Sequence, residues 1–248
     1  MTTVVVTTFS IDGYELYGHR MIETWLKHWP SDATLVVYTE GYALVESDPR
    51  LRSVDINDAC PELEPFKKSS RQLIKNPADK KSVNRVAKTI KWCHKVFAMH
   101  HALNNNQCDY LIFLDGDTYS KNTVPNNIAE QLVDNHLFAV HFEKLQHGLH
   151  FETGLISFNL AHPQIAILKD KLISEYVNLQ IYEHKKTWDG FWFAYLYEKH
   201  KLDVLDLSGG RFTGVFTNKL IKNLLVHEAG NNKYIGKNFD RYSGRKIN

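Results

Sequence analysis

Two aspartates separated by one glycine, Asp115-Gly116-Asp117, directly follow the apolar run Tyr110–Leu114. The apolar run predicts a buried strand, and side chains two positions apart on an extended backbone lie on the same side. Asp115 and Asp117 can therefore reach one hard cation, and Gly116 lets a ligand of that cation approach the backbone. The motif predicts a divalent-metal site for a phosphate-bearing substrate. The alternative is an acidic turn after a strand, since Asp-Gly is a common turn dipeptide.

The composition indicates one soluble domain with a sizeable core, because 43% of the 248 residues are hydrophobic and 23% are charged. The net charge of +2 selects no class of partner. No basic segment precedes the strand-like Val4–Val6, and no apolar run reaches the roughly 20 residues of a membrane span. We therefore expect a cytoplasmic protein without a signal peptide or membrane span. An odd number of cysteines without CxxC spacing agrees with a reducing compartment: Cys60, Cys93 and Cys108.

The first forty residues predict a β-α-β unit. Residues 2–8 and 34–39 are β-branched and read as buried strands. Apolar residues at helical spacing from Tyr17 to Trp29 lie between them, and Pro30 ends that helix. Such a unit favours parallel strands, and ligands of open α/β sheets collect beyond the carboxyl ends of the strands. Residues expected at that edge are Thr7, Thr8, Phe9, Tyr14 and the two aspartates.

A basic stretch precedes the acidic motif. Residues 57–81 contain three prolines and read as irregular, whereas the period of residues 82–103 predicts a helix. Lys88, Lys91 and Lys95 share one face of this helix, which could point at the same cleft. Phosphate binding and a solvated face are both consistent with the pattern. Ten basic residues form the stretch: Lys67, Lys68, Arg71, Lys75, Lys80, Lys81, Arg85, Lys88, Lys91 and Lys95.

The remaining chain continues the alternation of strands and helices that is typical of a single α/β domain. We expect this domain to cover residues 1–232 and a basic C-terminal tail or lid to cover residues 233–248. The predicted helices are 126–134, 163–177 and 188–198, and the predicted strands are 137–140, 153–159, 203–207 and 224–226.

Three motifs occur in a specific order: Asp115–Asp117, then FETGLISFN at 151–159, then HEAGNNK at 227–233. Together they resemble the GT-A glycosyltransferases of family 8, which include glycogenin and bacterial lipopolysaccharide galactosyltransferases. The resemblance extends from the first strand to Lys233. It implies a GT-A fold, which is a Rossmann-like α/β domain with a mixed, mostly parallel central sheet. It also implies transfer of a sugar from a nucleotide-diphosphate sugar, with UDP as the expected nucleotide, and retention of anomeric configuration.

The family pattern makes His227 the third metal ligand beside Asp115 and Asp117. Two carboxylates and an imidazole suit Mn²⁺ and also allow Mg²⁺. The resemblance further implies that Lys91, or Lys88 one turn earlier, contacts the donor. Thr8 and Tyr14 match the nucleoside-binding region. Gly230 and Lys233 would approach the diphosphate, where charge builds up during transfer.

The acceptor side depends on Glu152 and Asp189, the carboxylates expected at the β face of the donor sugar. Either could stabilise an oxocarbenium-like state or attack it. Asp189 is equally suited to cap the helix that follows it. Trp188 and Trp192 are candidates for stacking on a sugar, although aromatic residues at this spacing more often belong to a core.

The acceptor itself stays open between a glycan, a protein and a modified DNA base. The basic stretch and tail favour a second hypothesis, a phage-type enzyme that glycosylates a modified base in DNA. A third hypothesis is a metal-dependent nucleotidyltransferase or sugar-nucleotide phosphohydrolase that uses the same acids.

Overall fold

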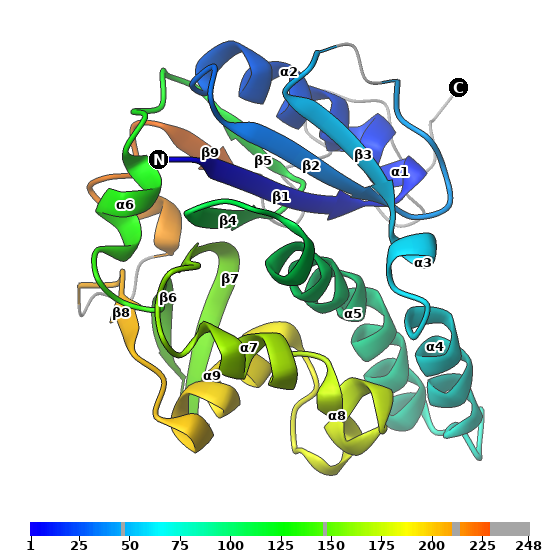
Figure 1. Cartoon of the computed structure of the whole chain (residues 1–248). Coiled ribbons are helices and arrows are strands. Elements are labelled where there is room, and N and C mark those ends of the chain that lie inside the picture. The colour runs from blue at the N-terminus through cyan, green and yellow to red at the C-terminus, as the bar shows by residue number, and fades with distance from the viewer. Residues whose placement is uncertain (46–47, 146–147, 210–213, 229–248) are drawn as a thin grey trace.

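A computed structural model describes residues 1–45, 48–145, 148–209 and 214–228 of the chain (Figure 1). A seven-stranded sheet in the order β3-β2-β1-β4-β7-β6-β8 forms its centre, and β5 and β9 form a separate two-stranded sheet. Strands β3, β2, β1 and β4 are parallel neighbours, and β7 alone runs against the others in the large sheet. The strands are β1 (Thr3–Phe9), β2 (Thr34–Thr39), β3 (Leu51–Asp55), β4 (Tyr110–Leu114), β5 (Thr118–Ser120), β6 (Phe138–Leu145), β7 (Gly148–Asn159), β8 (Val204–Asp206) and β9 (Leu225–His227).

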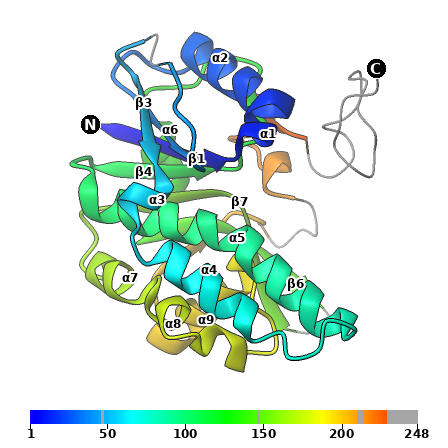
Figure 2. The ribbon, with the colours of Figure 1, turned by 90° about the vertical axis from the view of Figure 1, so that its right-hand side faces the viewer.

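Helices cover both faces of the large sheet, which gives three layers (Figures 1 and 2). Successive residues of a strand face opposite sides, so Val4 and Val6 join one core whereas Val5 joins the other. The first core lies under α4, α5 and α9, and the second lies under α2 and α6. The helices are α1 (Ile11–Gly13), the π-helical turn η1 (Tyr14–Gly18), α2 (His19–His28), α3 (Ile56–Ala59), α4 (Leu63–Gln72), α5 (Lys80–Asn105), α6 (Ile128–Val133), α7 (Ile165–Lys171), α8 (Ser174–Val177), η2 (Gln180–Glu183), α9 (Asp189–His200) and η3 (Val215–Thr217).

The predicted β-α-β start is confirmed, since β1 pairs with β2 in parallel and Val6 lies opposite Val36. The predicted strand before the acidic motif is also confirmed as β4. The expected α/β fold with a mixed, mostly parallel sheet is therefore correct. None of the helices in the described ranges is long and apolar enough to cross a bilayer.

Two regions differ from the sequence predictions. Residues 57–81 are not irregular, because α3 and α4 occupy much of this stretch and α4 packs beside α5 (Figure 2). Pro65 lies in the first turn of α4, where proline costs little because that backbone N–H has no helical partner. The helix predicted over 163–177 is divided into α7 and α8, with α8 starting at Ser174. Its predicted start at Pro163 is also wrong, because α7 begins at Ile165.

Candidate functional site

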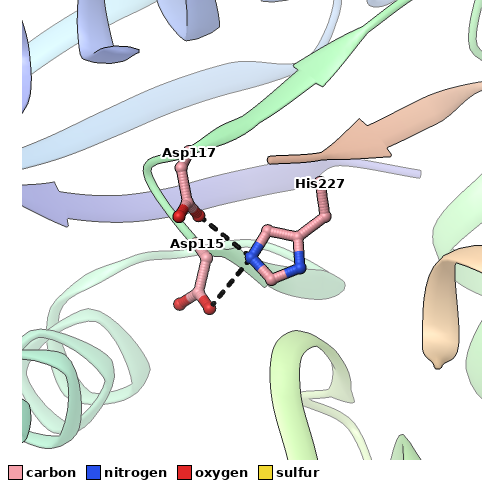
Figure 3. Close-up of side chains that lie close together, drawn as sticks. All are labelled: Asp115, Asp117 and His227. Carbon is pink, nitrogen blue, oxygen red and sulfur yellow. Dashed lines mark ion pairs between the residues drawn. The ribbon is translucent and has the colours of Figure 1, made fainter. Parts of the chain in front are cut away.

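Asp115, Asp117 and His227 converge from different parts of the chain (Figure 3). Asp115 directly follows β4, and its backbone N–H donates to the Gly154 carbonyl of β7 at 2.9 Å. The chain then enters β5, which pairs antiparallel with β9 so that Thr118 lies opposite His227. A residue from near the end of the described chain is thereby placed beside two acids that lie more than a hundred positions earlier.

The three side chains lie close enough to share one cation. His227 Nε2 lies 3.0 Å from Asp117 Oδ1 and 3.8 Å from Asp115 Oδ2, and one ligand atom from each residue lies within 4.8 Å of the others. All three side chains are partly accessible. Two carboxylate oxygens and one imidazole nitrogen form a donor set that suits Mn²⁺ or Mg²⁺, so the residues present fit a divalent cation.

The electrostatics of the cluster favour a positive charge among its side chains. Burial raises the pKa of Asp115, Lys95 opposes that rise, and the neighbouring Asp117 adds to it. Burial lowers the pKa of His227, but its hydrogen bond and charge interaction with Asp117 outweigh burial and leave that pKa raised. The acids thus favour a proton or another cation among them, which is the environment that a metal ion would stabilise.

Glycine is required between the two acids by close packing. A Cβ atom at Gly116 would lie 2.6 Å from Cδ1 of Phe9 in β1, which is closer than side chains approach one another. The turn after β4 therefore lies directly against the end of β1, and both strand ends open into the same cavity.

Lys95 of α5 is the centre of a second cluster beside the first. Its Nζ lies 2.7 Å from Asp115 Oδ1 and 2.9 Å from Asp189 Oδ2, and it donates to Thr153 Oγ1 at 3.1 Å. The Thr153 hydroxyl donates in turn to Asp189 Oδ2 at 2.6 Å. Burial alone would lower the pKa of Lys95, but the two carboxylates outweigh it and raise that pKa, so the ammonium stays charged. For Asp189, Lys95 and Thr153 overcome the effect of burial and lower the pKa.

Asp189 is buried and is the first residue of α9, where a negative charge is favourable. The N-cap position belongs to Trp188, so the expectation that Asp189 caps the helix is wrong. The charge of Asp189 is instead held by Lys95 and Thr153.

Glu152 lies on β7 and faces the same cavity. Its Oε2 accepts a hydrogen bond of 2.6 Å from the backbone N–H of Val215. The backbone of the segment before β9 therefore orients one oxygen of this carboxylate.

One cavity of about 770 Å³ connects these groups, a size in the upper half of the range of about 300–1,000 Å³ that is usual for small-molecule sites. The predicted basic face of α5 does point into it, through Lys88, Lys91 and Lys95. Sequence-predicted site residues that line the cavity are Thr8, Lys88, Lys91, Asp115, Asp117, Glu152, Asp189 and His227.

Four predicted residues are not among the described residues that line this cavity. Tyr14 packs against Phe9, with ring centroids 6.2 Å apart, and is not among the cavity-lining residues. Gly230 and Lys233 lie outside the described residues, as does the predicted tail 233–248. Trp192, predicted as one of two stacking candidates, is fully buried in the core and does not line the cavity.

The cavity also reaches the carboxyl ends of β1 and β2. Thr8 lines it there, and the Thr8 hydroxyl oxygen is buried without a hydrogen-bond partner in the described parts of the chain. Glu40, directly after β2, and His94 of α5 line the same end, with His94 Nδ1 3.6 Å from Glu40 Oε1. Polar side chains therefore line the part of the cavity that lies at the carboxyl ends of β1 and β2.

Sequence reasoning placed Lys95 on the basic face but did not include it among the donor-binding residues. Its signal was only the spacing that it shares with Lys88 and Lys91. Lys95 differs from both because it is buried whereas they are exposed. This difference depends on the elements that pack against each position of the helix, which the spacing along the chain does not indicate.

The fold defines the class of protein to which the chain is similar. The α/β fold with a large, mostly parallel sheet matches that of GT-A glycosyltransferases. No protein-family model matches the sequence, and no curated protein sequence matches it.

Two solved structures illustrate the likeness. Mouse xyloside xylosyltransferase 1 in its apo form aligns with a TM-score of 0.55 and 14% identity, over 94% of this chain and 99% of that chain. The glycosyltransferase GlyE of Streptococcus pneumoniae aligns with a TM-score of 0.51 and 13% identity, over 100% of this chain and 57% of that one. At such low identity, these similarities establish the fold.

Proposed function

We propose that the chain is a metal-dependent glycosyltransferase that moves a sugar from a nucleotide-diphosphate sugar, with UDP as nucleotide, to an acceptor hydroxyl. The convergence of Asp115, Asp117 and His227 in a large cavity at the carboxyl end of β4 carries this proposal. The glycosyltransferase fold of the structural neighbours supports it. The three ordered motifs of the sequence also support membership of family 8, with Mn²⁺ as the cation and retention of configuration.

The acid cluster would hold the cation, which supplies positive charge to the leaving diphosphate. In the transfer, the bond from the anomeric carbon to the phosphate oxygen breaks and its electron pair stays on the diphosphate. A bond from the acceptor oxygen to the anomeric carbon forms, and the proton of the acceptor hydroxyl passes to the departing diphosphate. Lys88 and Lys91 lie on the cavity wall and add positive charge on the side of the phosphates.

Lys95 has a positioning role in this proposal, because it links metal-binding Asp115 to Asp189 through one ammonium group. Asp189 is thereby held as a carboxylate beside the acid cluster, where it stabilises positive charge at the anomeric carbon. Glu152 is the second carboxylate available for this task. Thr8 lies at the nucleoside end of the cavity, where its unpartnered hydroxyl is available to the ribose or the base.

The resemblance of the third motif to the family pattern adds Gly230 and Lys233 to the proposal. Both follow His227 closely in the chain, so they would be near the diphosphate if that histidine binds the cation. Tyr14 keeps no direct role in the cavity; through its contact with Phe9 it supports the end of β1.

The test measures UDP release from UDP-sugars, with and without Mn²⁺, for the wild type, Asp115→Asn and Asp117→Asn. We expect both variants to lose donor turnover by at least about a hundredfold, while their melting temperatures show that they remain folded. Asp58→Asn is a matched control, because Asp58 is an exposed aspartate of α3 away from the cavity. Full turnover in the presence of EDTA, or in both cavity variants, contradicts the proposal.

A further inference from the structure

Two tryptophans distinguish the end of the cavity that lies beyond Asp189. The chain has five tryptophans, and Trp25, Trp29 and Trp192 are buried in the cores. Trp92 of α5 and Trp188 at the start of α9 are only half-buried, and both line the cavity. Their ring centroids are 6.3 Å apart and their planes meet at 70°. Because folding normally buries most of an indole, two adjacent half-buried rings in a cavity wall indicate a surface for a ligand.

A paired imidazole and carboxylate lie beside these rings. Nδ1 of His150 lies 2.8 Å from Oε2 of Glu143, and both side chains line the cavity. The imidazole ring of His150 also lies 5.9 Å from the ring of Trp188, centroid to centroid. Hydrogen-bonding groups are therefore placed at the margin of an aromatic surface.

The position of this group of side chains is fixed by close packing. A Cβ atom at Gly190 would lie 2.1 Å from the carbonyl oxygen of Phe151 and 2.6 Å from Nε2 of His150. The start of α9 therefore lies directly on β7, which holds Trp188 and His150 in their relative positions. Lys186 further restrains Trp188, because its ammonium lies 5.0 Å from the centre of that ring.

We propose that Trp92, Trp188, His150 and Glu143 form the acceptor subsite and that the acceptor is a carbohydrate. The inference rests on the proposed glycosyltransferase function. A sugar ring presents a patch of C–H groups on its face and hydroxyls around its edge. The indole rings match the patch, and the His150–Glu143 pair matches the hydroxyls. Since Trp188 directly precedes Asp189, a sugar bound there lies next to the carboxylate that faces the donor.

The geometry favours a sugar over an extruded DNA base. A planar base fills a gap between parallel surfaces, whereas the rings of Trp92 and Trp188 are steeply inclined to each other. Glu143 and Glu152 also line the cavity and would repel a phosphate backbone. A protein hydroxyl, in turn, has no ring face for the two indoles to cover.

Direct binding tests the subsite. Saturation-transfer NMR would measure binding of lactose, maltotriose and xylotriose to the wild type, Trp92→Ala and Trp188→Ala. A serine-rich peptide and a DNA duplex that contains 5-hydroxymethylcytosine serve as competing ligands. We expect at least one saccharide to bind, with an affinity at least about tenfold weaker in each tryptophan variant. Phe191→Ala is the matched control, because Phe191 is a half-buried aromatic residue of α9 that does not line the cavity, and we expect less than about a twofold change.

A second measurement separates this inference from the proposed function. UDP release to water, measured on the wild type without any acceptor, reports the donor site alone. Saccharide binding that depends on both tryptophans, without any turnover of UDP-sugars, would overturn the proposed function and leave the carbohydrate subsite standing. Donor turnover without saccharide binding overturns the subsite, and so does preferred binding of the peptide or the DNA. Equal saccharide affinity in the wild type and the tryptophan variants overturns it as well.

Discussion

Replacing Lys95 by methionine removes the positive charge that lies between Asp115 and Asp189 while keeping a side chain of similar length. The Lys95 side chain is only 11% exposed, and the ammonium contacts Asp115, Asp189 and Thr153. Removing one partner from a buried ion pair costs about 3–5 kcal/mol, because the other charge stays buried without compensation. The lower end of this range applies, since the Asp115 side chain is 31% exposed whereas that of Asp189 is 8% exposed.

A loss of about 3 kcal/mol lowers the melting temperature of a domain of this size by roughly 6–12 °C. Thermal unfolding without metal measures this difference between the wild type and Lys95→Met. Lys91→Met is the matched control, because Lys91 is exposed on the same helix and lines the same cavity, and we expect a change within about 0.5 kcal/mol.

Two further comparisons identify the origin of the effect. Adding Asp189→Asn to Lys95→Met should recover part of the stability, because the uncompensated charge is removed together with its partner. Mn²⁺ should stabilise Lys95→Met more than the wild type, since a cation on Asp115 replaces part of the missing charge. A Lys95→Met protein that melts within 2 °C of Lys91→Met would refute the reasoning, where ~2 °C is the shift expected for less than about 1 kcal/mol.

Three other substitutions give separate predictions. Gly190→Ala should destabilise the fold by about 1–3 kcal/mol in urea unfolding, because its Cβ would overlap the Phe151 carbonyl; unchanged stability would show that α9 and β7 are not in close contact. Burial and Lys67 lower the pKa of His94 to about 4, so the unfolded chain takes up a proton first as the pH falls. The free energy of unfolding therefore falls by roughly 3 kcal/mol as the pH drops from 6.5 to about 4, and this contribution is fully present above pH 6.5. Urea unfolding at pH 7 and 4.5 should show a smaller fall for His94→Gln than for the wild type. An equal fall in both would exclude His94 as the source. Glu152→Gln should melt within roughly 2 °C of the wild type, since its amide oxygen can still accept from Val215, but should lower donor turnover about a hundredfold; turnover like that of the wild type would remove Glu152 from the catalytic residues.

The central part of the fold could be predicted from the sequence because its signals are local. Buried parallel strands are continuous apolar runs, and β1, β2 and β4 are of this kind. Strand β3 has the sequence LRSVD and only one fully buried residue, Leu51, so it lacks such a run and was not predicted. It becomes a strand because β2 offers it a parallel partner along its whole length.

The candidate site was predicted in part for a similar reason. The acids after β4 follow an obvious strand, and His227 was found through the order of three motifs rather than through local pattern. The pairing of β5 with β9 carries His227 to the acids. The strand predicted over 224–226 corresponds to β9, whereas β5 has only three residues and was not predicted, so the pairing itself could not be predicted.

Tertiary packing determines which of the remaining residues lie in the site. Lys95 is distinguished from Lys91 by the elements that bury it, and Trp188 from Trp192 by the side of α9 that faces the core. The pair His150–Glu143 requires the register of β6 and β7, in which Glu143 lies opposite His150. None of these arrangements is encoded by spacing along the chain alone.

The shared cation is the claim on which the proposed function depends. A crystal of the protein soaked with Mn²⁺ and UDP, measured for the anomalous signal of manganese, tests it most directly. The proposed function predicts one strong manganese peak coordinated by Asp115, Asp117 and His227, with the diphosphate completing the coordination. A manganese peak elsewhere, or UDP bound with no metal between its phosphates and the three side chains, would contradict it.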